Sequence, residues 1–108
     1  MIDWAQVDEM KLEMGAGFKE VAVMFLDEVG EVISRIEAGP APGTLGAELH
    51  FLKGAALNLG FSDFADLCER GEKLALQNRE GDIDLANLLM CYRASREVFR
   101  AGVKLDAA

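Results

Sequence analysis

The only histidine of the chain, His50, lies in a segment whose residue types could support covalent chemistry. An imidazole with an ordinary pKa of about 6.5 is largely neutral near pH 7, so one ring nitrogen keeps a lone pair for nucleophilic attack. Lys53 follows three residues later, which in a helix places its ammonium within one turn of the imidazole. That ammonium can donate hydrogen bonds to an anionic group on the ring. The pair predicts a nucleophile suited to carrying a phosphoryl group, with Lys53 as its local positive charge.

Small residues flank this histidine on both sides in helical spacing. Gly46 and Gly54 lie four residues before and after it. Each glycine costs about 1 kcal/mol relative to alanine inside a helix, which indicates a purpose other than helix stability. Close helix packing is one such purpose, but the phase of both glycines points away from the predicted core. We therefore expect Gly54 to clear space for a partner, and we expect Gly46, Ala47 and the outward-facing Leu57 to form the docking surface.

Apolar residues that recur with helical spacing predict five helices. The first three cover roughly residues 3–14, 16–37 and 44–59. The fourth is expected to be capped by Ser62, and the fifth to begin at Asp82 or Asp84. Pro40 and Pro42 mark the clearest linker. The expected fold class is all-α: an up-and-down antiparallel four-helix bundle with a short additional N-terminal helix.

The leucines of the third helix determine where its histidine points. At about 100° per residue, His50 lies roughly 140° from the centre of the apolar stripe and should be exposed. The stripe consists of Leu45, Leu49, Leu52, Ala56 and Leu59. On the next helix, charged pairs that include Glu72-Lys73 are expected to be a solvated face.

Composition narrows the functional classes. The 108 residues fit one domain, residues 1–108, and the net charge of −8 disfavours nucleic acid and anionic membrane surfaces as partners. No apolar run reaches the ~20 residues of a membrane span, and the N-terminus has no basic signal-peptide region. Cys68 and Cys91 are expected in the core, which fits a reducing cytoplasm. The sequence has no glycine-rich phosphate loop, and a single histidine cannot build a di-iron site, so no cofactor is expected.

A resemblance to histidine phosphotransfer (Hpt) domains is carried by one continuous segment, His50-Phe51-Leu52-Lys53-Gly54-Ala55-Ala56-Leu57-Asn58-Leu59-Gly60. The family pattern is His-x-Leu-Lys-Gly, two small residues, and a glycine after a short apolar stretch. Residues 61–72 and the upstream Phe25 are also similar, so that the resemblance covers residues 2–104. One departure is Leu49, where many members have a small residue. No residue of the next helix is matched to the site by motif.

This resemblance implies that His50 is the phosphorylated residue, that Lys53 helps to hold the phosphoryl group and that Gly54 admits the incoming receiver. The protein would then be a phosphoryl carrier rather than an enzyme. It would accept a phosphoryl group from a receiver aspartate in two-component signalling and pass it to another receiver. The implied partners are response-regulator receiver domains and a hybrid histidine kinase, and the receivers would supply Mg²⁺. A complete four-helix core favours a monomer.

Two alternatives keep the same fold. The segment from Gly60 to Glu72 is also similar to the phosphotransfer domain of chemotaxis-type histidine kinases, which an ATP-binding kinase domain phosphorylates. The chain contains no ATP-binding segment, which favours a separate relay protein unless the sequence is part of a longer one. The second alternative is a helical interaction module that is never phosphorylated. The presence of both His50 and Lys53 counts against it.

Overall fold

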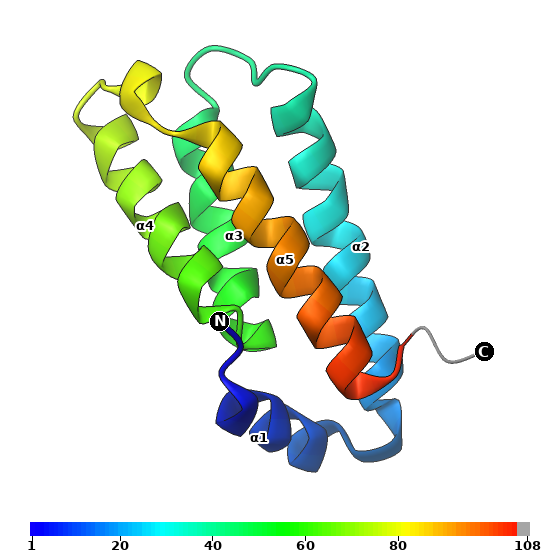
Figure 1. Cartoon of the computed structure of the whole chain (residues 1–108). Coiled ribbons are helices and arrows are strands. Elements are labelled where there is room, and N and C mark those ends of the chain that lie inside the picture. The colour runs from blue at the N-terminus through cyan, green and yellow to red at the C-terminus, as the bar shows by residue number, and fades with distance from the viewer. Residues whose placement is uncertain (106–108) are drawn as a thin grey trace.

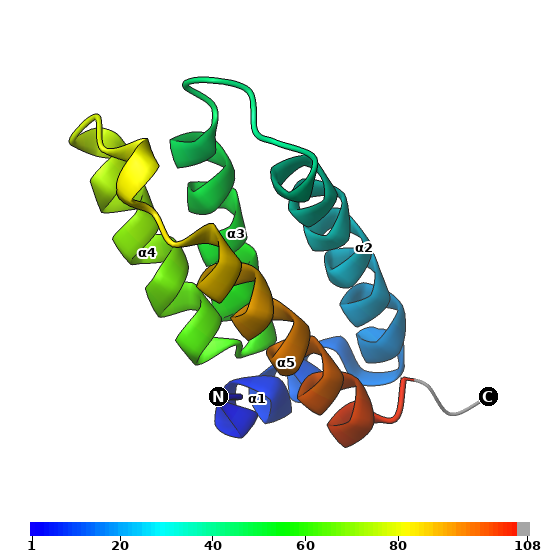
Figure 2. The ribbon, with the colours of Figure 1, turned by 45° about the horizontal axis from the view of Figure 1, so that its top comes forward.

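The computed structural model describes residues 1–105, and it shows a bundle of antiparallel helices with one short helix at its end (Figure 1). Helices α2 to α5 form the bundle, and α1 lies across the end where α3 and α4 are joined (Figure 2). Turns of 3-10 helix follow α1 and precede α5, at 15–17 and 80–82. The α-helices are α1 (Trp4–Met14), α2 (Phe18–Glu37), α3 (Leu45–Leu59), α4 (Ser62–Leu76) and α5 (Leu85–Val103). The predicted all-α fold class and helix order are confirmed.

The predicted apolar stripes form the core. All five stripe residues of α3 are buried, and they pack against buried faces of the other helices. Phe61 and Phe99 close one end of the core with an edge-to-face contact at 5.4 Å between ring centroids. Cys68 is fully buried, and this burial raises the pKa of its thiol to about 12. No helix in residues 1–105 is both long and apolar enough to span a membrane.

The predicted helix caps are partly confirmed. Asp84 caps α5, because its side chain accepts a hydrogen bond from the backbone N–H of Asn87 at 3.0 Å. Ser62 does not cap α4, and that prediction is wrong. Phe61 occupies the N-cap position, and the Ser62 hydroxyl donates instead to the carbonyl of Met1 at 3.1 Å. The reason is that the buried Phe61 ring must reach the core directly after α3 ends.

A two-residue connection, Gly60-Phe61, sets how α3 and α4 pack. Gly60 ends α3 in the left-handed conformation with φ of 77°, which glycine adopts without a steric penalty. Its carbonyl accepts a hydrogen bond from the backbone N–H of Asp3 at 2.7 Å. The short connection places α3 and α4 side by side, and it also ties the N-terminal segment to the bundle.

Replacing Gly60 with alanine should lower the free energy of unfolding by about 2–4 kcal/mol, because a strained φ and overpacking act together. An added Cβ would lie 2.7 Å from the Asp3 carbonyl oxygen and 3.2 Å from Val7 Cγ2. Urea denaturation measures this loss. Gly81→Ala is the matched control, since Gly81 has no positive φ and nothing within 4 Å of an added Cβ. Equal midpoints for the two variants would contradict this account of the turn.

Candidate functional site

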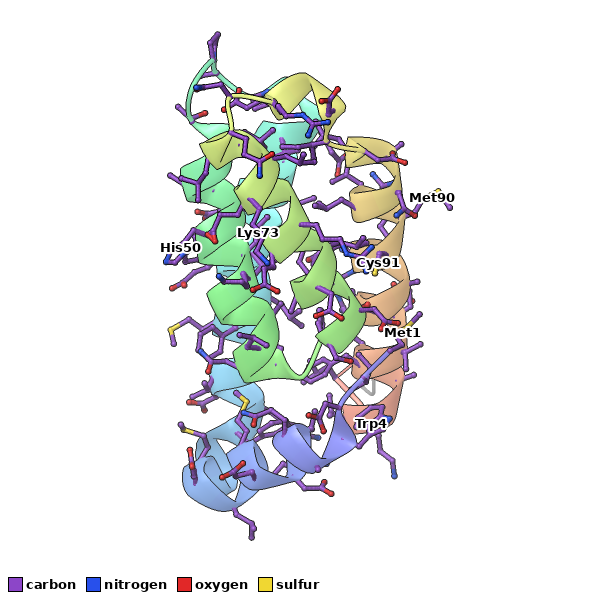
Figure 3. All side chains as sticks on the ribbon, turned by 90° about the vertical axis from the view of Figure 1, so that its left-hand side faces the viewer. Met1, Trp4, His50, Lys73, Met90 and Cys91 are labelled. Carbon is purple, nitrogen blue, oxygen red and sulfur yellow. The ribbon has the colours of Figure 1, made fainter. Side chains whose placement is uncertain are left out.

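His50 projects from the outer face of α3. Its side chain is 73% exposed, as the helix phase predicts, while the preceding residue Leu49 is fully buried. Figure 3 shows His50 at one edge of the molecule, whereas Met90 and Cys91 lie on α5 at the opposite edge. The imidazole is therefore accessible to a large partner.

The neighbouring helix holds this imidazole through Glu72. His50 Nδ1 lies 2.8 Å from Glu72 Oε2 and 3.3 Å from Oε1. A carboxylate only accepts hydrogen bonds, so Nδ1 must carry the proton and donate it. In the neutral ring the lone pair then belongs to Nε2, which has no hydrogen-bond partner among residues 1–105. The contact selects both the orientation and the tautomer of the histidine.

Glu72 also binds Lys53. The Lys53 Nζ atom donates to Glu72 Oε1 at 3.1 Å, and the Glu72 side chain is only 14% exposed. The hydrogen bond from His50 and the one from Lys53 hold the pKa of the Glu72 carboxyl below its ordinary value. Glu72 is thus ionised at neutral pH, and the Lys53 ammonium is anchored within one helical turn of the imidazole.

The two flanking glycines differ in their surroundings. A Cβ added at Gly54 would meet nothing within 4 Å, which agrees with its predicted role of leaving space for a partner. A Cβ added at Gly46 would lie 3.1 Å from the Cβ of Ala75 on α4. Gly46 therefore also permits the close approach of α3 and α4, the packing role that its predicted outward phase had argued against.

A family comparison completes these observations. The family model of the Hpt domain matches residues 20–101, from the start of α2 almost to the end of α5. The chain belongs to the Hpt domain family. Neither the curated proteins nor the solved structures gave a match. Hpt domains carry out histidine phosphotransfer in two-component signalling and interact with receiver domains of response regulators.

The face of the Hpt domain around its histidine is hollowed between α3 and α4. This α3–α4 hollow has a volume of about 580 Å³, and Glu72 forms part of its wall. Its lining includes His50 together with the predicted docking residues Gly46 and Ala47. Leu57 is more than half exposed and lies two turns along α3. The structure thus places the predicted docking residues around His50, and their contact with a partner stays a prediction.

Sequence reasoning missed Glu72, which was expected on a solvated face. That expectation is wrong because Glu72 lies at the edge of the apolar face of α4, next to the buried Gly71. The two-residue connection Gly60-Phe61 could have indicated this position, because it fixes the register of α4 against α3. Counting back along α3 and forward along α4 from Gly60-Phe61 brings Glu72 opposite His50. Among residues 1–105, no group of three or more histidine, cysteine and carboxylate side chains could hold a metal ion.

Filling the space at Gly54 should block phosphotransfer without weakening the fold. We expect Gly54→Leu to slow transfer from a phosphorylated receiver by roughly 10²-fold, since a displacement of about 1 Å at the reacting atoms has that effect. The stability of the Gly54→Leu variant should equal or exceed that of the wild type, because leucine is a better helix former than glycine. Stopped-flow transfer kinetics and thermal denaturation separate the two effects. Gly30→Leu on α2 is the control, since its Cβ also meets nothing within 4 Å. Equal transfer rates for both variants would show that no clearance is needed.

Proposed function

We propose that this Hpt domain is a phosphorelay intermediate that accepts a phosphoryl group on His50 from a receiver aspartate and donates it to another receiver. The observation that supports this most directly is the exposed imidazole whose Nδ1–H is bound by Glu72. Hpt domains carry out histidine phosphotransfer, and we therefore infer that the chain acts as a carrier of the phosphoryl group. A hybrid histidine kinase is the proposed source of the relay, and the cytoplasm its proposed location.

In the proposed step, the Nε2 lone pair of His50 attacks the phosphorus of the receiver's aspartyl phosphate. The bond between phosphorus and the aspartyl oxygen breaks, and its electron pair stays on the departing carboxylate. The imidazole becomes positively charged as the new bond forms, and the Glu72 carboxylate stabilises this charge through the Nδ1–H it already accepts. No proton has to leave the ring. The reverse sequence returns the phosphoryl group to a second receiver.

Lys53 can support the phosphorylated state. Its ammonium is bound to Glu72, from where it can turn toward phosphoryl oxygens one helical turn away. Phosphoryl transfer depends mainly on positioning and charge neutralisation. The Mg²⁺ that neutralises charge in such transfers would belong to the receiver.

The test is transfer of radiolabelled phosphate from phosphorylated receiver domains of the source organism. We expect acid-labile, base-stable label on the protein, which a second receiver then removes. Labelling only by an ATP-bound kinase domain, with no exchange with any receiver, would support the kinase-domain alternative. Absence of label from every donor would support the other alternative, an interaction module that is not phosphorylated.

A further inference from the structure

A second depression lies between α2 and α3, on the other side of the exposed ridge of α3. This α2–α3 groove has a volume of about 410 Å³. Ala47 lines both this groove and the α3–α4 hollow that holds His50, so the two depressions are neighbours. The walls of the α2–α3 groove are formed by Glu28, Glu31, Val32 and Arg35 of α2 and by Ala47, Glu48 and Phe51 of α3.

The groove has an excess of negative charge. Glu28 and Glu31 are exposed, and neither forms an ion pair among the described residues 1–105. Glu48 accepts a hydrogen bond from Arg35 Nε at 3.0 Å through Oε1, while its buried Oε2 has no hydrogen-bond partner in that part of the chain. Three carboxylates therefore face a single guanidinium.

The remaining wall is apolar. Val32 is buried along it, and Phe51 is 42% exposed beside it. Apolar walls next to unpaired carboxylates suit a side chain with an aliphatic stem and a cationic head, which describes lysine and arginine. The same charges would repel a nucleic acid.

The groove also lies within the footprint of any partner that reaches His50. Phe51 follows the histidine directly, and Ala47 precedes it by one helical turn. A domain that brings an aspartate to the imidazole covers an interface of about 800 Å² per partner, which is enough to extend over the adjacent groove.

From these features we propose that the α2–α3 groove selects among receiver domains by binding a lysine or arginine side chain at the edge of the cognate receiver. This inference rests on the proposed relay function, and it adds a specificity site to it. Glu28 and Glu31 attract the cationic head, while Phe51 and Val32 contact its stem.

The experiment reverses the charge of the groove with the double variant Glu28→Lys, Glu31→Lys. The matched control is Glu9→Lys, Glu13→Lys, which makes the same change in net charge at exposed positions of α1, outside both depressions. Phosphorylated receiver domains of the source organism are the probes, with single-turnover transfer rates measured at low and high salt. Phosphoramidate, a small donor that needs no docking surface, reports whether His50 itself remains reactive.

We expect the groove variant to lower kcat/KM for the fastest wild-type receivers by at least about tenfold at low salt, and less at high salt. The control should stay within about twofold, and labelling by phosphoramidate should be unchanged for all proteins. Equal slowing by the two double variants would overturn the proposal, since it would show an effect of net charge alone. Unchanged rates in the groove variant would overturn it as well. If no receiver labels the wild-type protein although phosphoramidate does, the relay function itself fails, and the specificity site fails with it.

Discussion

Replacing His50 with glutamine should abolish phosphoryl uptake, with a loss of at least about 10³-fold in the transfer rate from any receiver. The glutamine amide nitrogen has a delocalised lone pair and cannot attack phosphorus. The glutamine amide can still donate a hydrogen bond to Glu72, so it replaces the contact that His50 Nδ1–H makes with that carboxylate. Transfer is measured with radiolabelled phosphorylated receivers under single-turnover conditions.

The fold should be unaffected by this change. His50 is mostly exposed, and substitutions at such positions alter the free energy of unfolding by about 0.5 kcal/mol or less. Circular dichroism and thermal denaturation provide the control. A folded His50→Gln protein that accepts phosphate at the wild-type rate would show that another residue carries the phosphoryl group.

Removing the carboxylate of Glu72 should also slow transfer strongly. Glu72→Ala leaves Nδ1 of His50 without its acceptor, so the ring loses its preferred orientation and tautomer. We expect transfer to slow on the order of 10- to 100-fold, the range typical when the hydrogen-bond partner of a metal-bound histidine is removed. The loss should appear in kcat rather than KM, because the predicted docking residues Gly46, Ala47 and Leu57 are unchanged.

The conservative variant Glu72→Gln separates positioning from charge. Its amide oxygen can still accept from Nδ1–H, so it should recover part of the rate that Glu72→Ala loses. It cannot offset the positive charge that develops on the ring, so recovery should be incomplete. Identical rates for wild type and Glu72→Ala would rule out a positioning role.

The ion pairs of Glu72 should also make the free energy of unfolding depend on pH in the acid range. Its hydrogen bonds with His50 and Lys53 lower the pKa of the carboxyl in the folded protein. The resulting stabilisation is present above the ordinary carboxyl pKa of about 4.3, and it is lost as the pH falls through the lower value of the folded state. Glu72→Gln should therefore lose less stability than wild type on acidification. Urea denaturation between pH 7 and 3 checks this, and parallel curves would contradict it.

Local sequence patterns were sufficient to predict the bundle and the exposure of its histidine. The leucine stripe of α3 determines the phase of that helix, and His50 points outward as a direct consequence. Glu72 could not be predicted in the same way, because its contact depends on the register between two helices. That register follows from the Gly60-Phe61 connection rather than from the periodicity of either helix.

The errors at Ser62 and Gly46 have the same physical origin. A serine before an acidic helical turn is a good N-cap by local rules, but burial of Phe61 moves the start of α4. For Gly46, helix phase alone could not show the Cβ of Ala75 on the neighbouring helix. In each case tertiary packing decided what local propensity left open.

The position of the phosphoryl group on the imidazole ring tests whether Glu72 leaves Nε2 of His50 as the nucleophile. The protein is labelled by a phosphorylated receiver, and phosphorus NMR with mass spectrometry locates the phosphate. Since Glu72 binds Nδ1–H, we expect phosphate on Nε2 of His50 and on no other atom. Phosphate on Nδ1, or on any other residue, would contradict it.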